Sequence, residues 1–365
     1  MKIIHCADIH LDSPLTRFVS EEKRKERKAE LLLAFIKMIE YAAANSVEAV
    51  IIAGDLFDQS KINNTTCNTV LAAIRENSCI DFYYLKGNHD NGNAFAKTED
   101  LPKNLHMFRD EWTYYNLGEN ICLAGVELSP SNASGISASL NLDLSMFNIV
   151  ALHGQESVAA SKDRTVVINL KEYKNKNIDY MALGHIHTFK REKLDERALY
   201  CYPGCLESRG FDECGEHGFV LLDINGPERS YTGIPVSLPI RSSRLVSVDV
   251  SDLMSSAEII RRCEEVLDEL AYPAGDIVKL ELKGTVDINC EIEPVLISSC
   301  FAGKYYDFKL ENNTKRKVDF EAFKLDESLK GEFIKLVEAA ADLSDEDKAE
   351  IISIGIKAMV ERVVE

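Results

Sequence analysis

Long apolar runs are missing from this chain of 365 residues. No segment approaches the roughly 18 to 20 uninterrupted apolar residues that a membrane-spanning helix needs, so we expect no membrane partner. The first residues already have the pattern of a strand, and a charged-then-apolar leader is absent. Internal repeats and low-complexity tracts are absent as well. Together these absences predict a folded protein of the cytoplasm.

Positive charge is scarce. The chain has 60 acidic and 42 basic residues, and its formal net charge is −18 at pH 7. This charge repels polyanions at long range, so tight unassisted binding to nucleic acid is not expected. Divalent cations in a site could still accept a phosphate locally, and a basic partner could supply the grip on a duplex. The basic residues between Lys23 and Lys28 are interleaved with glutamates, which predicts a solvated helix face.

A disulfide framework is not evident, although the chain has ten cysteines. Their scattered positions predict thiols in a reducing compartment, several of them buried. One group of potential zinc ligands comprises Cys201, Cys205, Cys214 and His217. The irregular spacing of this group favours ordinary buried thiols over a zinc site.

The first two thirds of the chain alternate between predicted helices and strands. Segments 21–45 and 65–77 have apolar residues at helical spacing, and the apolar segment 82–85 then returns as a strand. Farther along, shorter strand-like pieces such as 121–126 indicate a second sheet. We therefore predict the α/β class, with a two-sheet α/β sandwich core over residues 1–238.

A second, smaller domain is predicted over residues 239–322. The segment 235–239, which has a proline at each end, predicts a break in regular structure. A strand, a helix and a strand are then expected at 245–250, 255–270 and 277–283. This alternation indicates an α+β domain that follows the core.

Residues 323–365 are predicted to form C-terminal helices. A polar break at 342–347 separates two of them, and Ser344 followed by Asp347 resembles the start of a helix. The apolar faces of these helices need a cover, and two alternatives stay open: packing on this chain or docking onto a partner's helix. The faces comprise Phe333, Ile334, Val337, Ile352, Ile356, Met359 and Val363.

Polar residues gather at the ends of five predicted strands. Apolar runs precede most of them, for example 50–52 before Asp55 and 149–152 before His153. Carboxyl ends of strands in α/β sheets border a common crevice, so these residues can converge from distant parts of the chain. Taken singly, each segment could be a cap or a turn, but together they predict one site. The segments are Asp8-Ile9-His10, Gly54-Asp55-Leu56-Phe57-Asp58, Gly87-Asn88-His89-Asp90, His153-Gly154 and Gly184-His185-Ile186-His187.

The residue types in these segments suit a centre of two divalent metal ions. Carboxylates, imidazoles and an asparagine carbonyl, with no cysteine among them, favour ions such as Mn²⁺. Two ions about 3.5 to 4 Å apart need one ligand that touches both, and Asp55 is the candidate bridge. Such a pair lowers the pKa of a shared water, which attacks phosphorus in line. We expect His89 to stabilise the developing charge or to protonate the leaving oxygen, with Asp90 orienting its ring. Loop position places Lys61 near an entering phosphate.

In this order, the five segments resemble the motifs of the calcineurin-like metallophosphoesterase superfamily, which are D-x-H, G-D-x-x-D, G-N-H-(D/E), H and G-H-x-H. The resemblance implies a metal-dependent phosphodiesterase in which His89 is the catalytic histidine. It also implies two ligand sets. One metal would be held by Asp8, His10, Asp55 and His187, and the other by Asp55, Asn88, His153 and His185.

Within the superfamily the chain is similar to bacterial nuclease subunits of the SbcD and YhaO type. The similarity rests on segments 5–12, 53–58, 202–211 and 213–219, and it extends only loosely beyond about residue 235. It implies a manganese-dependent DNA exonuclease or endonuclease of DNA repair, with residues 239–322 as a DNA-contacting cap. It further implies that an SbcC-like ABC ATPase with coiled coils is the partner.

A homodimer is also implied, because proteins of this type often dimerise through helices near the second and third motifs. Segment 65–77 could serve, although its apolar face could equally cover the sheet.

Three functions other than a nuclease are compatible with parts of this pattern. Ser/Thr protein phosphatases of the superfamily carry Arg-Gly shortly after the second-motif aspartate, whereas this chain has Asp58-Gln59-Ser60. A small-molecule or cyclic-nucleotide phosphodiesterase would use the same metal site, and acidic charge would matter less to it. The additional domain favours a polymer substrate instead. A non-catalytic scaffold is disfavoured because His89 and every predicted ligand are present.

Overall fold

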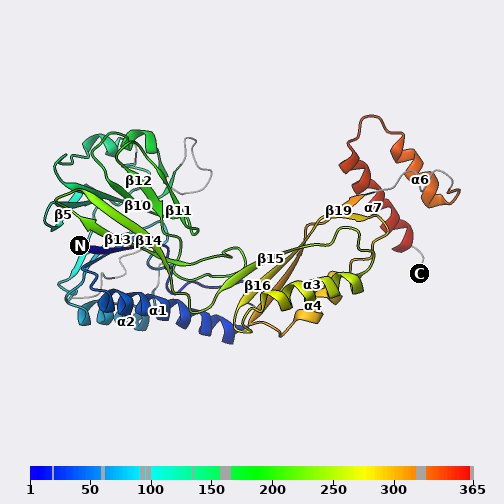
Figure 1. Cartoon of the computed structure of the whole chain (residues 1–365), viewed down its shortest axis with the longest axis horizontal. Coiled ribbons are helices and arrows are strands. Elements are labelled where there is room, and N and C mark those ends of the chain that lie inside the picture. The colour runs from blue at the N-terminus through cyan, green and yellow to red at the C-terminus, as the bar shows by residue number, and fades with distance from the viewer. Residues whose placement is uncertain are drawn as a thin grey trace. The chain divides into compact units, whose positions relative to one another are not determined.

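The computed structural model describes residues 1–18, 20–58, 62–90, 95, 100–133, 135–156, 166–317 and 326–361. The chain forms two compact units, Met1–Ser242 and Ser243–Glu365 (Figure 1). The divisions that we predicted at 238/239 and 322/323 remain predictions. Within the described ranges, no helix is both long and apolar enough to cross a membrane.

The first sheet of the amino-terminal unit has the strand order β14-β13-β1-β2-β3-β4. Strands β1 to β4 run parallel, whereas β13 and β14 are antiparallel to their neighbours. The apolar runs of β1, β2 and β3 are almost entirely buried, as expected of parallel strands covered on both faces. The strands are β1 (Lys2–Cys6), β2 (Ala49–Ala53), β3 (Asp81–Leu85), β4 (Leu105–Met107), β13 (Gly218–Asn225) and β14 (Ser230–Ser237).

Strand β14 runs through part of the segment for which we predicted a break. Pro235 pairs in register with Val220 of β13, and regular structure continues to Ser237. Since β14 is the outer strand of the sheet, a missing backbone N–H can be tolerated there. The predicted break therefore begins after Ser237, inside the predicted segment, and not at Pro235.

The second sheet has the order β11-β12-β10-β7-β6-β5. Its central strands β6, β7, β10 and β12 are parallel, and the outer strands β5 and β11 are antiparallel to their neighbours. This is the second sheet that the shorter strand-like segments predicted. The strands are β5 (Thr113–Gly118), β6 (Ile121–Gly125), β7 (Phe147–His153), β10 (Tyr180–Gly184), β11 (Lys190–Lys193) and β12 (Leu199–Tyr202).

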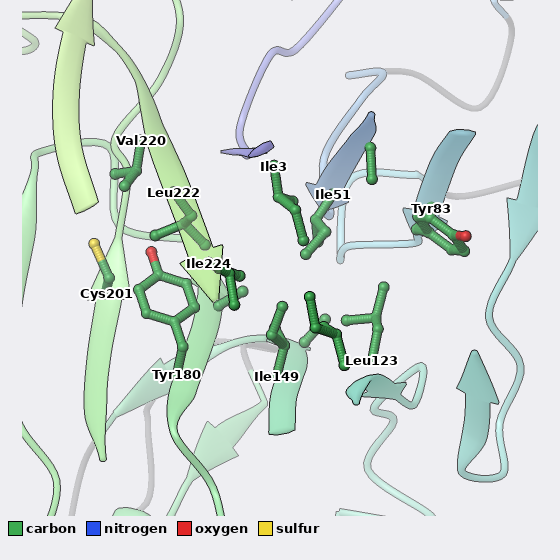
Figure 2. Close-up of a cluster of buried hydrophobic side chains, with 14 of the residues drawn as sticks. Ile3, Ile51, Tyr83, Leu123, Ile149, Tyr180, Cys201, Val220, Leu222 and Ile224 are labelled. Atoms are coloured by element: carbon green, nitrogen blue, oxygen red, sulfur yellow. The ribbon is translucent and has the colours of Figure 1, made fainter. Parts of the chain in front are cut away.

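The main core lies between the two sheets. Figure 2 shows Ile3, Ile51 and Leu222 of the first sheet facing Ile149 and Tyr180 of the second. These side chains are buried completely, which is the main source of favourable free energy for such a sandwich. The predicted two-sheet α/β sandwich is confirmed.

Helices α1 (Glu21–Ala44) and α2 (Asn64–Glu76) are the crossover connections of the first sheet, and they lie side by side in Figure 1. Both were predicted from helical spacing. The Ser20 side chain begins α1 by accepting from the Lys23 backbone N–H. The apolar residues of α2, such as Val70 and Ile74, are buried within this chain. The predicted homodimer therefore cannot rest on these buried side chains.

Arg27 of α1 departs from the solvated face that we predicted. It is completely buried, donates to Glu207 Oε1 at 3.0 Å, and also contacts Glu30 and the Ser208 carbonyl. Glu207 accepts the Ile240 backbone N–H at 2.7 Å as well. The buried arginine thus fixes the loop after β12 to α1.

Shorter elements cover the outer face of the second sheet. Leu140 and Tyr173 belong to a second apolar cluster there, together with Val150 and Met181 of the sheet. The short elements of this unit are η1 (Ile136–Ser139), η2 (Leu170–Tyr173), β8 (Gln155–Glu156) and β9 (Val167–Ile168).

The carboxy-terminal unit has its own core. A parallel sheet of order β15-β16-β18 buries one face against α3 and α4, with Val246, Leu280 and Ile259 in the cluster. The predicted strand, helix and strand correspond to β15, α3 and β16. The elements are β15 (Ser243–Asp249), α3 (Ser256–Leu270), β16 (Ile277–Lys283), β17 (Thr285–Asp287), α4 (Pro294–Phe301), β18 (Asp307–Asn312) and β19 (Lys315–Lys317).

Two helices follow, α6 (Leu329–Glu338) and α7 (Asp345–Glu361). The predicted start at Ser344 is confirmed, because its hydroxyl accepts the Asp347 backbone N–H at 3.2 Å. Ile334 and Ile352 pack against each other's helices and against Ile288, so part of the predicted apolar face is covered by this chain. The side chains of Met359 and Val363 lie outside the described part.

All ten cysteines lie in described segments and are thiols rather than disulfides. Cys201 is buried in β12, and the buried Cys205 Sγ lies 3.2 Å from His217 Nδ1. Cys201 and Cys205 lie in the interior, as expected of buried thiols, whereas Cys214 is only partly buried.

Gly184, the last residue of β10, lies against the end of β2 in the first sheet. A substitution there tests how closely the two sheets approach. A methyl group at Gly184 would lie 1.9 Å from the Ala53 carbonyl oxygen and 2.8 Å from His153 Nδ1. Because backbone must shift, we expect Gly184→Ala to lower the free energy of unfolding by about 1 to 3 kcal/mol. Gly118→Ala is the control, since its methyl group would meet only Met1 Sδ at 3.6 Å. Urea unfolding followed by circular dichroism measures both, and equal stability of the two variants would contradict the close approach of the sheets.

Candidate metal centre

Three parallel neighbours of the first sheet carry candidate ligands after their carboxyl ends. Asp8 and His10 follow β1, Asp55 follows β2 and Asn88 follows β3. Asp8, His10 and Asp55 have φ angles of 52°, 50° and 53°, a strained conformation that clusters at functional sites. Backbone hydrogen bonds maintain it: the Asp8 N–H donates to the Gly54 carbonyl at 3.1 Å, and the His10 N–H donates to the Asp55 carbonyl at 2.9 Å.

The second sheet supplies three histidines to the same rim. His153 ends β7, and His185 and His187 follow its parallel neighbour β10. The His185 backbone N–H donates to both carboxylate oxygens of Asp8, at 3.0 and 2.9 Å. This contact ties the end of the second sheet to the ligand loop of the first. All seven predicted ligands therefore meet at one edge of the sandwich.

Asp8, His10 and His187 form a first ligand group, whose ligand atoms lie within 4.8 Å of one another. His187 Nε2 lies 3.2 Å from His10 Nε2 and 3.9 Å from Asp8 Oδ1. Asp55 Oδ2 lies 3.8 Å from His10 Nε2. Two imidazoles and two carboxylates thus point to one position.

Asn88, His153 and His185 form a second ligand group. Asn88 Oδ1 lies 2.9 Å from His153 Nε2 and 3.2 Å from His185 Nδ1. Asp55 Oδ2 lies 3.3 Å from His153 Nε2. The same oxygen of Asp55 therefore faces both groups, which is the placement that a bridging carboxylate needs.

The electrostatics of this centre fit a cation. Asp8 and Asp55 are at most 1% exposed, and adjacent buried carboxylates require compensating positive charge. A proton can supply part of it: burial lowers the pKa of His153, but Asp55 and Asp8 outweigh this and raise it to about 9. A divalent ion can replace that proton, and the oxygen and imidazole donors suit ions such as Mn²⁺.

His89 lies at the exposed side of the centre. Its side chain is 47% exposed, and its Nδ1 lies 2.6 Å from Asp58 Oδ1. That hydrogen bond raises the pKa of His89 above its ordinary value and outweighs the opposing effect of burial. The His89 backbone N–H also donates to Asp55 Oδ1 at 2.8 Å. His89 is thereby fixed beside the ligand that faces both groups.

Asp90 does not orient the His89 ring in the way that we predicted. Its carboxylate accepts the Phe57 N–H at 2.8 Å and the Gly87 N–H at 2.9 Å, so it joins the loops after β2 and β3. Burial raises the pKa of Asp90 to about 6. The carboxylate that pairs with the ring is that of Asp58. Asp90 is thus a support of the loop rather than a partner of the ring.

Three residues beside the ligands were missed by sequence reasoning. Asp58 had a signal, because it ends the second motif, but it received no role. Glu213 Oε1 lies 2.8 Å from His187 Nδ1, and Arg209 pairs with the same oxygen at 2.7 Å. Burial by itself raises the pKa of Glu213, but His187 and Arg209 hold it well below its usual range. Lys61, predicted near an entering phosphate, lies outside the described residues.

Comparisons with known proteins agree with this geometry. The sequence model of the calcineurin-like phosphoesterase family matches residues 1–189. The uncharacterized metallophosphoesterase YhaO of Bacillus subtilis is 26% identical in an alignment of 304 positions that covers 78% of this chain and 72% of that protein.

Two nuclease-related proteins have similar sequence identity to this chain. The DNA double-strand break repair protein Mre11 of Sulfolobus acidocaldarius is 27% identical over 312 residues, 80% of this chain and 77% of that protein. The SbcD component of the nuclease SbcCD of Escherichia coli K12 is 25% identical over 292 residues, 66% of this chain and 70% of that protein. The chain belongs to the calcineurin-like phosphoesterase family and is a metal-dependent phosphoesterase.

Proposed function

We propose that this protein is a manganese-dependent DNA nuclease that hydrolyses phosphodiester bonds and acts in DNA repair. The observation that carries the proposal is the placement of Asp55 Oδ2 between two ligand groups, with His89 held beside them at the exposed rim. The relatives named as a DNA repair protein and as part of a nuclease support DNA as the substrate.

The ligands divide into two sets that share Asp55. Asp8, His10, Asp55 and His187 would hold one ion, and Asp55, Asn88, His153 and His185 the other. Two bound divalent ions supply an activated water and neutralise charge on the phosphate. This chain's residues keep the two positions close together and exclude water from Asp8 and Asp55.

His89 acts as the proton donor to the leaving oxygen. Its Nδ1 faces Asp58, which leaves Nε2 for the substrate side, and its partial exposure allows a phosphate ester to reach it. Asp58 favours the protonated ring and fixes its orientation. Asp58 therefore replaces Asp90 as the partner of His89, while Asp90 keeps the loop in place.

A partner is needed for tight binding to DNA. The net charge of −18 opposes contact with a polyanion, and a partner with a basic surface would reverse that. We propose an ATPase of the SbcC type, docked on the exposed apolar residues Leu329, Leu336 and Ile354 of α6 and α7. Residues 239–322 would contact the DNA. The protein would act in the cytoplasm, and a homodimer would be a further assembly.

The same charge supports a second candidate function. A phosphodiesterase for small or cyclic nucleotides would need the same ligands and would be less impeded by a charge of −18. The substrate, rather than the metal centre, separates the two functions.

One assay distinguishes these functions and tests His89. The metal-free protein is given Mn²⁺ and supplied with end-labelled linear DNA or with bis-p-nitrophenyl phosphate. We expect His89→Ala to lower DNA hydrolysis by about 10²- to 10⁴-fold, because an alkoxide leaving group needs a proton. The loss should be smaller for p-nitrophenolate, which leaves readily without one. His106→Ala is the control, since His106 lies on β4 and pairs with Asp81.

Full DNA hydrolysis by His89→Ala would refute the role of the ring. Cleavage of the small diester alone would favour the nucleotide phosphodiesterase function. If a basic ATPase then stimulated cleavage of DNA, the nuclease function would again be favoured.

A pH profile tests Asp58. Because Asp58 raises the pKa of His89, the protonated ring persists to higher pH than an isolated histidine would. In Asp58→Asn the pKa of His89 falls, so the alkaline limb of kcat/KM for DNA should move to lower pH. Mn²⁺ affinity is measured in parallel, since Asp58 Oδ1 also lies 3.4 Å from His10 Nδ1. An unchanged alkaline limb with intact metal binding would show that Asp58 does not tune the acid.

A further inference from the structure

Glu213 is a buried carboxylate that reaches the metal centre from outside the five motifs. It lies between β12 and β13, is 8% exposed, and contacts His187 Nδ1 at 2.8 Å. His187 Nε2 points the other way, toward Asp8 and His10. One imidazole therefore connects Glu213 to the first ligand group.

The tautomer of His187 decides whether its Nε2 can bind a metal. A neutral imidazole carries one proton, so Nε2 is available as a ligand only when the proton is on Nδ1. Glu213 accepts from a protonated Nδ1. Arg209, whose NH2 group lies 2.9 Å from the same Nδ1, can only donate and would favour the opposite tautomer. The two neighbours of His187 thus favour different tautomers.

Glu213 is held firmly enough to prevail in this competition. Its Oε2 accepts the Arg209 backbone N–H at 2.7 Å, and its Oε1 accepts from Arg209 Nε at 3.1 Å and from NH2 at 2.7 Å. Glu213 thus accepts from both Nε and NH2 of Arg209, whereas Arg209 can offer His187 Nδ1 only the remaining N–H of its NH2 group. Cys205 Sγ lies 3.9 Å from Oε2 and closes the other side.

Arg209 also contacts Asp58, the partner of the proposed proton donor His89. Arg209 NH1 lies 3.6 Å from Asp58 Oδ2, and the other oxygen of Asp58 contacts His89. The Arg209–Glu213 pair therefore contacts both the candidate ligand His187 and Asp58, the partner of His89.

We propose that Glu213 is a positioning residue that fixes His187 as a metal ligand, with Arg209 holding Glu213 and Asp58 in a common arrangement. The inference deepens the proposed two-metal function and rests on it. A carboxylate behind a ligating histidine typically contributes ten- to hundredfold to metal affinity. The consequence should be confined to the ion held by His187, because the ligands of the second group do not contact Glu213 among the described interactions.

Calorimetric titration with Mn²⁺ tests this in the full chain stripped of metal. We expect two manganese ions to bind the wild-type protein, and Glu213→Gln to weaken one of them ten- to hundredfold while the other is unchanged. The visible absorption of bound Co²⁺ should change in the same variant. Glu216→Gln is the matched control: it removes the same charge three residues away, where the carboxylate contacts Ser237. It should bind both ions as the wild type does.

The double variant Arg209→Gln/Glu213→Gln controls for misfolding, because it replaces the largely buried ion pair by a neutral pair and keeps the net charge. It should show the same selective loss with an unchanged circular dichroism spectrum. Wild-type affinity for both ions in a folded Glu213 variant would overturn the inference alone. A wild-type chain that binds no manganese would overturn the proposed function and the inference with it.

Discussion

The carboxylates of Asp8 and Asp55 are buried where the two sheets of the sandwich meet. Their negative charge must be balanced by neighbouring groups, because solvent water does not reach it. Neighbouring hydrogen-bond donors supply part of this balance. Backbone amides of His185 and His89 donate to the two carboxylates, which in turn raise the pKa of His153 above its ordinary value. Such a centre is only partly compensated by its own chain, and a divalent ion completes it. Affinity for metal is therefore a consequence of how the carboxylates are buried.

Balancing this charge requires the two sheets to approach closely at one edge. His153 Nδ1 lies 2.9 Å from the Ala53 carbonyl oxygen, so a strand end of the second sheet touches a strand end of the first. The same contact leaves His153 Nε2 directed at Asp55. Gly54, with a φ of 92°, and Gly184 have no side chain to obstruct the approach. The packing of the sheets therefore also sets the geometry of the ligands. A change that separates the sheets would displace ligands from both groups.

The sequence was sufficient to predict the sandwich and the convergence of its ligands, because local patterns carried that information. Apolar runs marked the buried strands, and each polar residue followed a run whose carboxyl end faces the same rim. Long-range pairings had no comparable signal. In the sequence Arg27 looks like the exposed charged residues around it, and only the fold brings Glu207 to it. Glu213 likewise lies 26 residues after His187, the histidine that it contacts. Asp90 was assigned to His89 because the two are adjacent in sequence, yet adjacent side chains often diverge, and Asp58 reaches the ring from another loop.

The net charge of −18 links metal binding to substrate choice. An acidic molecule attracts divalent cations to its surface and so favours loading of a buried centre, but the same field repels a DNA backbone. Both effects come from the same negative field, so on this chain metal loading cannot be strengthened electrostatically without weakening DNA binding. The proposed division of tasks would resolve the conflict: the chain would retain the acidic surface and the ions, and a basic partner would bring the DNA. The exposed apolar residues of α6 and α7 are consistent with such a partner, since apolar docking does not depend on the charge that DNA binding would have to overcome.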